Sequence, residues 1–200
     1  MYRLIESIRI ENKQLQHIDL HNKRFNTARK SLFGLLREVN LIDHIQLPNH
    51  LTDQRYKCRI TTSDGIKVEH EIRPYVQRKV ESLKLVTLDT IDYSIKTDQR
   101  ELLDDAYAKR GACDDVIIIK NNLLTDSWAA NILLFDGEKW VTPDTPLLNG
   151  IQREHLLRMK QISLQRISIE DLKKFKKVKL INAMLDFDRA PEIPIHQIFS

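Results

Sequence analysis

The stretch Leu124-Thr125-Asp126-Ser127-Trp128-Ala129-Ala130-Asn131-Ile132-Leu133 places an acid just before a run of apolar, strand-forming residues. Lys96 lies thirty residues before that acid, at the end of Ile91-Asp92-Tyr93-Ser94-Ile95-Lys96. After the acid come Thr142-Pro143, expected to form a turn, and then Gly150-Ile151-Gln152-Arg153. In this order the chain offers an amine that could form a Schiff base, an acid that could pair with a ring nitrogen, and a glycine-opened helix start that could hold a phosphate.

Composition limits the class of protein. The chain has 200 residues, with 32 Lys and Arg against 28 Asp and Glu, which is enough for one large domain or two small lobes. Because both signs are interspersed, we expect neither a nucleic-acid partner nor a membrane partner. The basic run Lys173-Lys174-Phe175-Lys176-Lys177-Val178-Lys179 is typical of a solvated helix end leading into a strand, with an anion-binding patch as the alternative. Cys58 and Cys113 form no disulfide framework and no apolar run has membrane-spanning length, so we expect a cytoplasmic protein.

Hydrophobic periodicity predicts a series of short elements. Residues 4–10 alternate apolar and polar, and a turn at Asn12-Lys13 predicts a hairpin with residues 14–18. Helical spacing predicts a helix from Asp19, as its N-cap, to about Val39, and a short helix is expected at residues 51–55. Further strands are expected at residues 56–62, 67–73, 83–88, 116–119, 128–135, 139–141 and 162–167, and further helices at residues 98–109, from Gly150 to about Met159, and from Ser168 with Asp171 in its cap.

These elements predict an α+β protein. Short strands alternate with helices, and Asp-Gly pairs at residues 64–65 and 136–137 mark hairpin turns, so we expect mixed, largely antiparallel sheets with packed helices. A boundary near residues 90–92 would divide the chain into a smaller N-terminal α/β lobe, residues 1–90, and a larger C-terminal lobe, residues 91–200. The larger lobe would carry Lys96 and the glycine-opened helix.

Each candidate residue also has a purely structural interpretation. Lys96 could be a surface lysine and Arg24 an exposed helix residue, because both types are rarely buried unless paired. Thr125-Asp126-Ser127 could be a turn closed by the aspartate. His17 and His21 are four residues apart but lack a third ligand, so we predict no metal site. No G-x-S-x-G elbow or phosphate-binding P-loop is present, which leaves acyl transfer and nucleotide hydrolysis without support.

The ordered segments resemble the class IV (fold type IV) pyridoxal-phosphate-dependent aminotransferase family, which includes branched-chain and D-amino acid aminotransferases and aminodeoxychorismate lyase. Upstream, Glu6-Ser7-Ile8-Arg9-Ile10 and His21-Asn22-Lys23-Arg24-Phe25 are similar to its Glu-Thr-Ile-Arg-Val strand and His-x-x-Arg-Leu helix. Downstream, Leu180-Ile181-Asn182-Ala183 resembles its late phosphate-side strand. This chain differs in having Asp126 where the family usually has Glu and Gln152 where it often has Thr, and in lacking the usual first strand.

This resemblance implies a two-lobed, D-amino acid aminotransferase-like fold and the cofactor pyridoxal 5'-phosphate. It implies that Lys96 is the catalytic, Schiff-base lysine and that Asp126 keeps the cofactor's ring nitrogen protonated. The remaining cofactor ligands would be Arg24, Ile151, Gln152, Asn182 and Ala183, with Ile151 and Gln152 acting through backbone N–H groups. It also implies a small-molecule substrate and a homodimer.

Within the family, two segments are similar to aminodeoxychorismate lyase. Ser94-Ile95-Lys96-Thr97-Asp98-Gln99-Arg100 resembles its Gly-Ile-Lys-x-x-x-Arg, and Trp128-Ala129-Ala130-Asn131 resembles its Cys-Ala-Ala-Asn. The resemblance therefore favours a 4-amino-4-deoxychorismate lyase, which releases pyruvate and forms 4-aminobenzoate for folate synthesis. Candidate partners for the substrate carboxylates are Arg59, Arg100 and Arg153, because arginine binds carboxylates in bidentate fashion. An amino acid aminotransferase, of branched-chain or D-amino acid type, and a cofactor-free binding protein are the alternatives.

Overall fold

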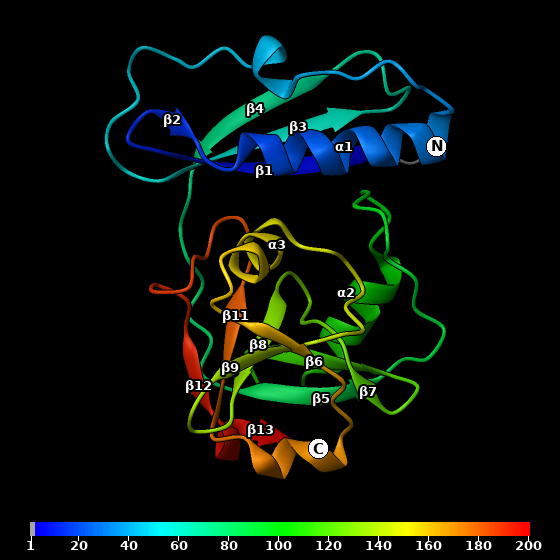
Figure 1. Ribbon diagram of the computed structural model, residues 1–200, viewed down its shortest axis with the longest axis vertical. Coiled ribbons are helices and arrows are strands. Elements are labelled where there is room, and N and C mark those ends of the chain that lie inside the picture. The colour runs from blue at the N-terminus through cyan, green and yellow to red at the C-terminus, as the bar shows by residue number, and fades with distance from the viewer. Residues whose placement is uncertain (1–2) are drawn as a thin grey trace. The chain divides into compact units, whose positions relative to one another are not determined.

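The computed structural model describes residues 3–200, and its contacts group the chain into two compact units (Figure 1). Unit 1 holds the chain up to Val76 together with Ile95–Gln99, and unit 2 holds Gln77–Ser94 and Arg100–Ser200. This division differs from the expected lobes of residues 1–90 and 91–200. The segment that follows Val76 groups with unit 2, and the short segment that carries Lys96 groups with unit 1.

Ile95–Gln99 joins unit 1 because it pairs with the beginning of the first strand. The Ile5 N–H donates to the Lys96 carbonyl oxygen at 2.9 Å, and the Asp98 N–H donates to the Arg3 carbonyl oxygen at 3.0 Å. An ion pair of 2.9 Å between the Arg3 and Asp98 side chains adds to this contact. These two residues are 95 positions apart, and a pairing over that separation leaves no local signal in the sequence.

Unit 1 is an antiparallel sheet with a long helix, α1 (Ile18–Phe33), on one face. The sheet has the strand order β2 (Gln14–Leu15), β1 (Leu4–Glu11), β3 (Tyr56–Thr62) and β4 (Glu69–Pro74). The core between helix and sheet includes Ile8, Ile10, Phe25, Ala28, Cys58 and Ile60. Because successive side chains of a strand point to opposite faces, Glu6 shares the α1-facing side of β1 with Ile8.

The strands and the long helix expected in unit 1 are confirmed, whereas the cap and the end of that helix, and the short helix at residues 51–55, were predicted wrongly. α1 is capped by His17 and not by Asp19, which lies in its first turn, and it ends at Phe33 and not near Val39. It stops because Gly34 adopts a left-handed conformation, φ 68°, and donates its N–H to the Lys30 carbonyl oxygen at 3.1 Å. Residues 51–55 contain no helix, whereas a 3-10 turn, η1 (Leu41–His44), precedes them.

Unit 2 is built on two mixed sheets. One has the order β13 (Ile198–Phe199), β5 (Leu83–Thr87), β6 (Asp115–Lys120) and β7 (Leu123–Leu124). The other has the order β10 (Ser163–Gln165), β9 (Trp140–Pro143), β8 (Asn131–Phe135), β11 (Lys177–Ile181) and β12 (Glu192–Pro194). The β13–β5, β5–β6 and β10–β9 pairs are parallel and the other pairs in these sheets are antiparallel, which confirms the expected α+β class with mixed sheets.

The two sheets pack on each other, and each carries a helix on its outer face. Ile117 of β6 and Ile132 of β8 share the central core. The next residue of each strand faces outward: Ile118 packs with α2 (Glu101–Ala108) and Leu133 packs with α3 (Ile151–Arg158). Because both faces of β6 and β8 are covered, these strands consist of uninterrupted apolar runs, as strands buried on both sides do.

Helices were expected where α2 and α3 lie, and both are confirmed. β8 begins at Asn131 and not at residue 128, because residues 127–130 form a turn closed by a 2.8 Å hydrogen bond from the Ser127 N–H to the Ala130 carbonyl oxygen. Thr142-Pro143 ends β9 and is not itself a turn. The helix expected from Ser168 is a short 3-10 helix, η2 (Glu170–Lys174), and its N-cap is Ile169 and not Ser168. Ser168 precedes it and donates from its N–H and Oγ to Asp171 Oδ2, at 3.0 and 3.1 Å.

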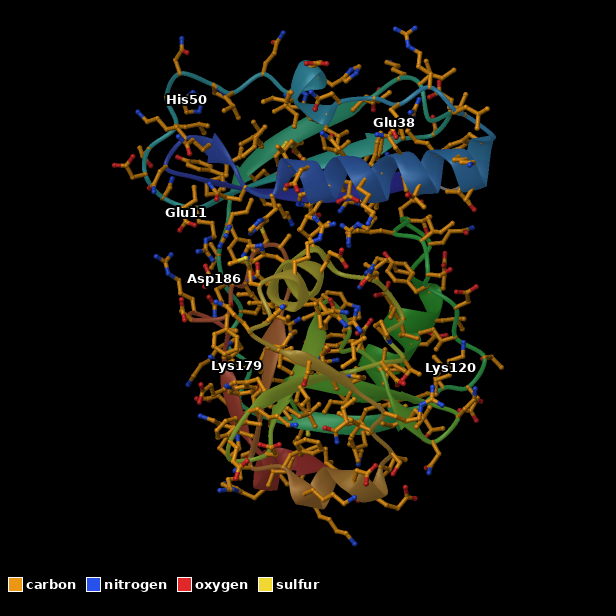
Figure 2. All side chains as sticks on the ribbon, viewed as in Figure 1. Glu11, Glu38, His50, Lys120, Lys179 and Asp186 are labelled. Atoms are coloured by element: carbon orange, nitrogen blue, oxygen red, sulfur yellow. The ribbon has the colours of Figure 1, made fainter. Side chains whose placement is uncertain are left out.

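The basic run is only partly solvated. Lys173, Lys174 and Lys176 are exposed. Lys179, labelled in Figure 2, is 5% exposed, and both it and Lys177 pair with Glu192, at 3.2 and 2.6 Å. The last turn of the chain, η3 (Ile195–Gln197), follows β12. None of the helices in residues 3–200 is long and apolar enough to cross a membrane.

Candidate functional site

Asp126 lies where the chain passes from one sheet of unit 2 to the other. The Ile118 N–H of β6 donates to the Asp126 carbonyl oxygen at 2.8 Å, and the turn at residues 127–130 then leads into β8. The side chain is 5% exposed and accepts hydrogen bonds from Asn131 Nδ2 at 2.7 Å and from the Leu148 N–H at 2.9 Å. Burial raises the pKa of Asp126 to about 6, against the lowering effect of these two hydrogen bonds and of the Arg153 charge.

Asn131 connects Asp126 with the loop before α3. Its Nδ2 also donates to the Leu148 carbonyl oxygen at 2.8 Å, and its Oδ1 occupies the space beside Gly150. A Cβ at Gly150 would lie 1.9 Å from that oxygen. The backbone of Gly150 has an ordinary extended conformation, φ −73°, so space and not backbone angle requires glycine here. The sequence predicted Gly150 only as a helix start.

The start of α3 offers donors for an anion. The first hydrogen bond of the helix runs from the Glu154 N–H to the Gly150 carbonyl oxygen, at 2.9 Å. The N–H groups of Ile151, Gln152 and Arg153 therefore have no acceptor within the helix, and the helix dipole makes this end partly positive. The predicted helix start is confirmed; phosphate binding by Ile151 and Gln152 stays a prediction.

The side chain of Arg153 ties α3 to the end of β9. Its Nη2 donates to the Pro143 carbonyl oxygen at 2.9 Å, its Nε to Thr142 Oγ1 at 3.2 Å and its Nη1 to Asn149 Oδ1 at 2.9 Å. The residue is 5% exposed. A guanidinium with all three nitrogens engaged inside the protein acts as a structural clamp, which argues against the expected contact of Arg153 with a substrate carboxylate.

Two buried polar atoms in this region have no hydrogen-bond partner among residues 3–200. They are Ser127 Oγ, directly after Asp126, and Gln152 Oε1, in the first turn of α3. Their residues are 2% and 3% exposed. An unpaired buried polar atom costs about 1–3 kcal/mol, so these atoms fit a place where a bound polar group supplies the missing hydrogen bonds.

Arg24 belongs to a buried charge cluster in unit 1. It donates from Nε and Nη2 to the two carboxylate oxygens of Glu6, at 2.8 and 2.6 Å, and His21 Nδ1 lies 2.7 Å from Glu6 Oε2. Burial alone would raise the pKa of Glu6, but the Arg24 charge and the hydrogen bonds from Arg24 and His21 outweigh it and hold this pKa well below its usual range. Burial, with smaller contributions from the charges of Arg24 and Lys96, lowers the pKa of His21 against the raising effect of Glu6. His21 is therefore neutral at pH 7 and donates its Nδ1 proton to Glu6.

Lys96 lies half-buried in the same unit, on the segment that pairs with β1. Its positive charge is among those that lower the pKa of His21, after Arg24. The lysine therefore lies within electrostatic reach of the Glu6–His21–Arg24 cluster. His21 Nε2 is buried and has no hydrogen-bond partner among the residues that the structure describes.

The other predicted residues have varied surroundings. Asn182 closes a turn after β11, with its Oδ1 accepting the Met184 and Leu185 N–H groups at 2.8 and 3.0 Å, and Ala183 lies half-buried within that turn. Asn182 Nδ2 donates to the Ala129 carbonyl oxygen at 3.0 Å, beside the turn that follows Asp126. This contact brings the predicted phosphate-side turn next to the Asp126 segment within unit 2.

Two arginines were predicted as substrate ligands besides Arg153. Arg59 is half-buried on β3 opposite Ser7, so it lies on the face of the sheet away from Glu6. Arg100, at the start of α2, donates to the Trp128 carbonyl oxygen at 2.8 Å and lies over the Trp128 ring at 5.2 Å from its centroid. Arg100 thus borders the turn after Asp126, within unit 2.

A surface hollow of about 330 Å³ also lies in unit 2, lined in part by Ile91, Lys120 and Leu147. Lys120, labelled in Figure 2, donates its Nζ to the Ile91 carbonyl oxygen at 2.5 Å. The ammonium group at the hollow is therefore bound by the protein itself. Neither Ser127 nor Gln152, with their unpaired atoms, lines this hollow.

Comparison with known proteins identifies the family of the chain. The sequence pattern of the family described as amino-transferase class IV matches residues 3–193. The chain belongs to the class IV aminotransferase family. Its α+β architecture is that of the family, and the family's cofactor is pyridoxal 5'-phosphate, as the sequence predicted.

Individual relatives extend the comparison. An uncharacterized protein of Haemophilus influenzae is 38% identical over 187 residues, which cover 92% of this chain and 98% of the relative. A crystal structure from Haemophilus somnus 129PT, named as a candidate 4-amino-4-deoxychorismate lyase, has a TM-score of 0.85 and 32% identity, covering 92% of this chain and 97% of that one. An aminotransferase from Brucella abortus, bound to pyridoxal phosphate, shares the fold with a TM-score of 0.77 and 15% identity, covering 98% and 81% of the two chains.

The residues present fit this cofactor. Unit 2 provides a buried acid for a ring nitrogen, helix N–H groups for a phosphate, and the unpaired Ser127 and Gln152 atoms. Unit 1 provides the Lys96 amine and the Arg24 guanidinium. Sequence reasoning gave no role to Glu6, His21 or Asn131. The signal for Glu6 was present, since a carboxylate on the apolar face of a strand needs a buried partner. The role of Asn131 depends on its contact with Leu148, seventeen residues away, which no sequence spacing identifies.

Proposed function

We propose that this protein is a pyridoxal-phosphate-dependent 4-amino-4-deoxychorismate lyase, which eliminates pyruvate to give 4-aminobenzoate for folate synthesis. The observation that carries the proposal is the 32% identity, over 92% of the chain, with the Haemophilus somnus protein named as a candidate for that activity. The position of Arg100 beside the turn after Asp126 supports it, because the substrate carries carboxylates that need a cation.

In this proposal the chain's own groups have distinct tasks. The cofactor, when bound, withdraws electrons from the substrate bond that breaks. Lys96 Nζ would hold the cofactor, and its amine would take up and return protons as general base and acid. The Asp126 carboxylate keeps the ring nitrogen protonated. The N–H groups of Ile151 and Gln152, with Arg24, bind the phosphate.

The first test is the visible absorption spectrum of the purified protein with added pyridoxal phosphate. We expect a band of bound cofactor in the wild type and its loss in Lys96→Ala, because no other group would supply the amine. Lys173→Ala, which removes an exposed lysine, is the matched control and should keep the band. No band in the wild type would exclude the enzyme and favour a cofactor-free binding protein on this fold.

A class IV amino acid aminotransferase is the second candidate, because the family is described by that activity. The two reactions differ in their products. We expect 4-aminobenzoate and pyruvate to form in equal amounts from 4-amino-4-deoxychorismate without an added keto acid. Amino transfer to a keto acid, from a branched-chain or D-amino acid, in the absence of pyruvate release would support the aminotransferase instead.

Arg100 provides a test of substrate recognition. We expect Arg100→Ala to raise KM for aminodeoxychorismate by about 10- to 100-fold, since a lost charged hydrogen bond is worth roughly 1.5–3 kcal/mol. Arg78→Ala is the control, because Arg78 lies over the same Trp128 ring, at 5.2 Å, and has no assigned role in binding. Equal effects of both substitutions would assign Arg100 to packing.

We propose two further properties, a homodimer and a cytoplasmic location. Site residues are shared across a dimer interface in the family that the sequence resembles, and both cysteines are free thiols. Light scattering at several protein concentrations tests the first property. A mass of a single chain throughout would contradict it.

A further inference from the structure

Asn131 stands out among the residues without an assigned role, because it contacts both the acid and the loop before α3. We infer that Asn131 is a positioning residue, which fixes the Asp126 carboxylate and locks it to the loop that opens α3. The acid and the phosphate-binding end of the helix are then held as one preformed group. The role of this group toward pyridoxal phosphate rests on the proposed function, whereas the lock itself is a property of the chain.

Three hydrogen bonds make a closed arrangement, called here the Asn131 latch. Asn131 Nδ2 uses one hydrogen for Asp126 Oδ1, at 2.7 Å, and the other for the Leu148 carbonyl oxygen, at 2.8 Å. The Leu148 N–H then returns to Asp126 Oδ2 at 2.9 Å. Within the latch each oxygen of the Asp126 carboxylate has a donor, and both hydrogens of the Asn131 amide have an acceptor.

The latch depends on an amide at residue 131. Alanine would leave Asp126 Oδ1 without this donor in a place where the acid is 5% exposed. Aspartate would have no donor for either Asp126 or the Leu148 carbonyl oxygen, and it would add a second carboxylate beside the first. Since Asp126 is also one methylene shorter than the glutamate usual in the family, its reach toward a ligand depends on where its backbone and these hydrogen bonds hold it.

Gly150 provides a second, independent feature of the same latch. If residue 150 had a Cβ, that atom would lie only 1.9 Å from Asn131 Oδ1, which is too close for two non-bonded atoms. A side chain there would displace the amide without removing it. Only glycine at position 150, before α3, leaves room for the Asn131 amide. Asn131 therefore connects the acid to the helix start by close packing as well as by hydrogen bonds.

A double-mutant cycle on pyridoxal phosphate affinity tests the positioning role. We expect Asn131→Ala to weaken pyridoxal phosphate binding by about tenfold or more, as loss of a charged hydrogen bond does. In an Asp126→Asn background the same substitution should weaken binding by less than about twofold, because the two residues act as one. Asn26→Ala is the matched control: Asn26 also joins two segments through both ends of its amide, at Val39 in unit 1. Additive effects, or no effect of Asn131→Ala, would overturn the inference.

A second measurement needs no cofactor. Titration of the Asp126 carboxyl carbon by NMR in the unliganded protein should show a higher pKa in Asn131→Ala than in the wild type, because a donor to the charged form is lost. An unchanged pKa would overturn the latch. If the wild type fails to bind pyridoxal phosphate, the proposed function fails, and this titration still decides whether Asn131 holds the acid.

Gly150→Ala covers the case in which Asn131→Ala does not fold. Its Cβ would push the intact amide away, so we expect the same rise of the Asp126 pKa as in Asn131→Ala. In the Asn131→Ala background, where that space is open, Gly150→Ala should add less than about twofold to the loss of affinity. A Gly150→Ala protein with wild-type affinity and an unchanged Asp126 pKa would contradict the proposed use of this glycine.

Discussion

Asp126 shows how one residue can couple stability to pH. Because burial raises its folded-state pKa to about 6 from an ordinary 3.8, the folded, ligand-free protein holds a proton on this acid up to a higher pH than the unfolded chain does. Its contribution to stability is present below pH 3.8 and is lost as pH rises through about 6. We expect the free energy of unfolding, measured relative to Asp126→Asn, to fall by about 3 kcal/mol over that interval. Denaturant titrations from pH 3.5 to 7.5 would show it; a constant difference would contradict it.

The contribution of Glu6 to stability depends on pH in the opposite direction. Its folded-state pKa lies below the ordinary 4.5, so its contribution to stability is present above pH 4.5 and is lost as pH falls. We expect Glu6→Gln to lower the free energy of unfolding at pH 7 by about 3–5 kcal/mol, because it removes the buried carboxylate that pairs with both Arg24 and His21. Glu81→Gln, at the exposed pair of 2.8 Å with Lys79, should cost under about 1 kcal/mol. Equal losses would argue against the buried cluster.

Residue chemistry could be predicted from sequence where a single residue carries the signal. Lys96, Asp126 and Gly150 were identified by order and type, and the structure places Asp126 in a buried site. The partners could not be predicted. Glu6 meets His21 because β1 packs on α1, and Asn131 meets Leu148 because a loop returns to β8; both contacts depend on packing and not on spacing in the sequence.

Two glycines show, at the scale of the element, two different costs of adding a side chain: backbone strain alone at Gly34, and backbone strain with lack of space at Gly65. Gly34 ends α1 with φ 68° and has open space around it, whereas Gly65 has φ 73° and a Cβ there would lie 2.6 Å from the Phe33 ring. We expect Gly34→Ala to cost about 1 kcal/mol from conformation alone and Gly65→Ala to cost at least about 1 kcal/mol more, because the ring must move. Urea denaturation of both variants gives the order; a larger loss for Gly34→Ala would contradict it.

Elements were predictable where the signal is local. The Asp64-Gly65 and Asp136-Gly137 pairs identified two hairpin turns, and the apolar run of β6 identified a buried strand. The end of α1 was not predicted, because Leu35 and Leu36 continue the apolar pattern beyond Gly34, although Leu36 is 75% exposed. Backbone conformation at one glycine outweighed the pattern there.

At the scale of the whole molecule, the sequence predicted two lobes with a boundary near residues 90–92, whereas the contacts divide the chain first at Val76. Each unit has its own apolar core, one formed by α1 with β1 and β3, and the others by the two sheets of unit 2 with α2 and α3. The chain passes from one unit to the other at Val76, at Ser94 and at Gln99. The return of the chain to unit 1 over Ile95–Gln99 could not be predicted. This segment joins unit 1 by pairing with the beginning of β1, which is far away in the sequence.

That return divides the proposed cofactor ligands between the units, with Lys96 and Arg24 in unit 1 and Asp126 and α3 in unit 2. Pyridoxal phosphate should therefore slow amide hydrogen exchange both at residues 95–99 and at residues 150–154. Bound cofactor should also raise the free energy of unfolding, by about 2.7 kcal/mol at a cofactor concentration of 100 times Kd. The melting temperature should therefore rise with cofactor concentration. In Lys96→Ala we expect a smaller rise and loss of protection at residues 95–99, with protection at residues 150–154 kept by the phosphate. Protection in one unit only for the wild type would mean that the ligands named in the other do not bind this cofactor.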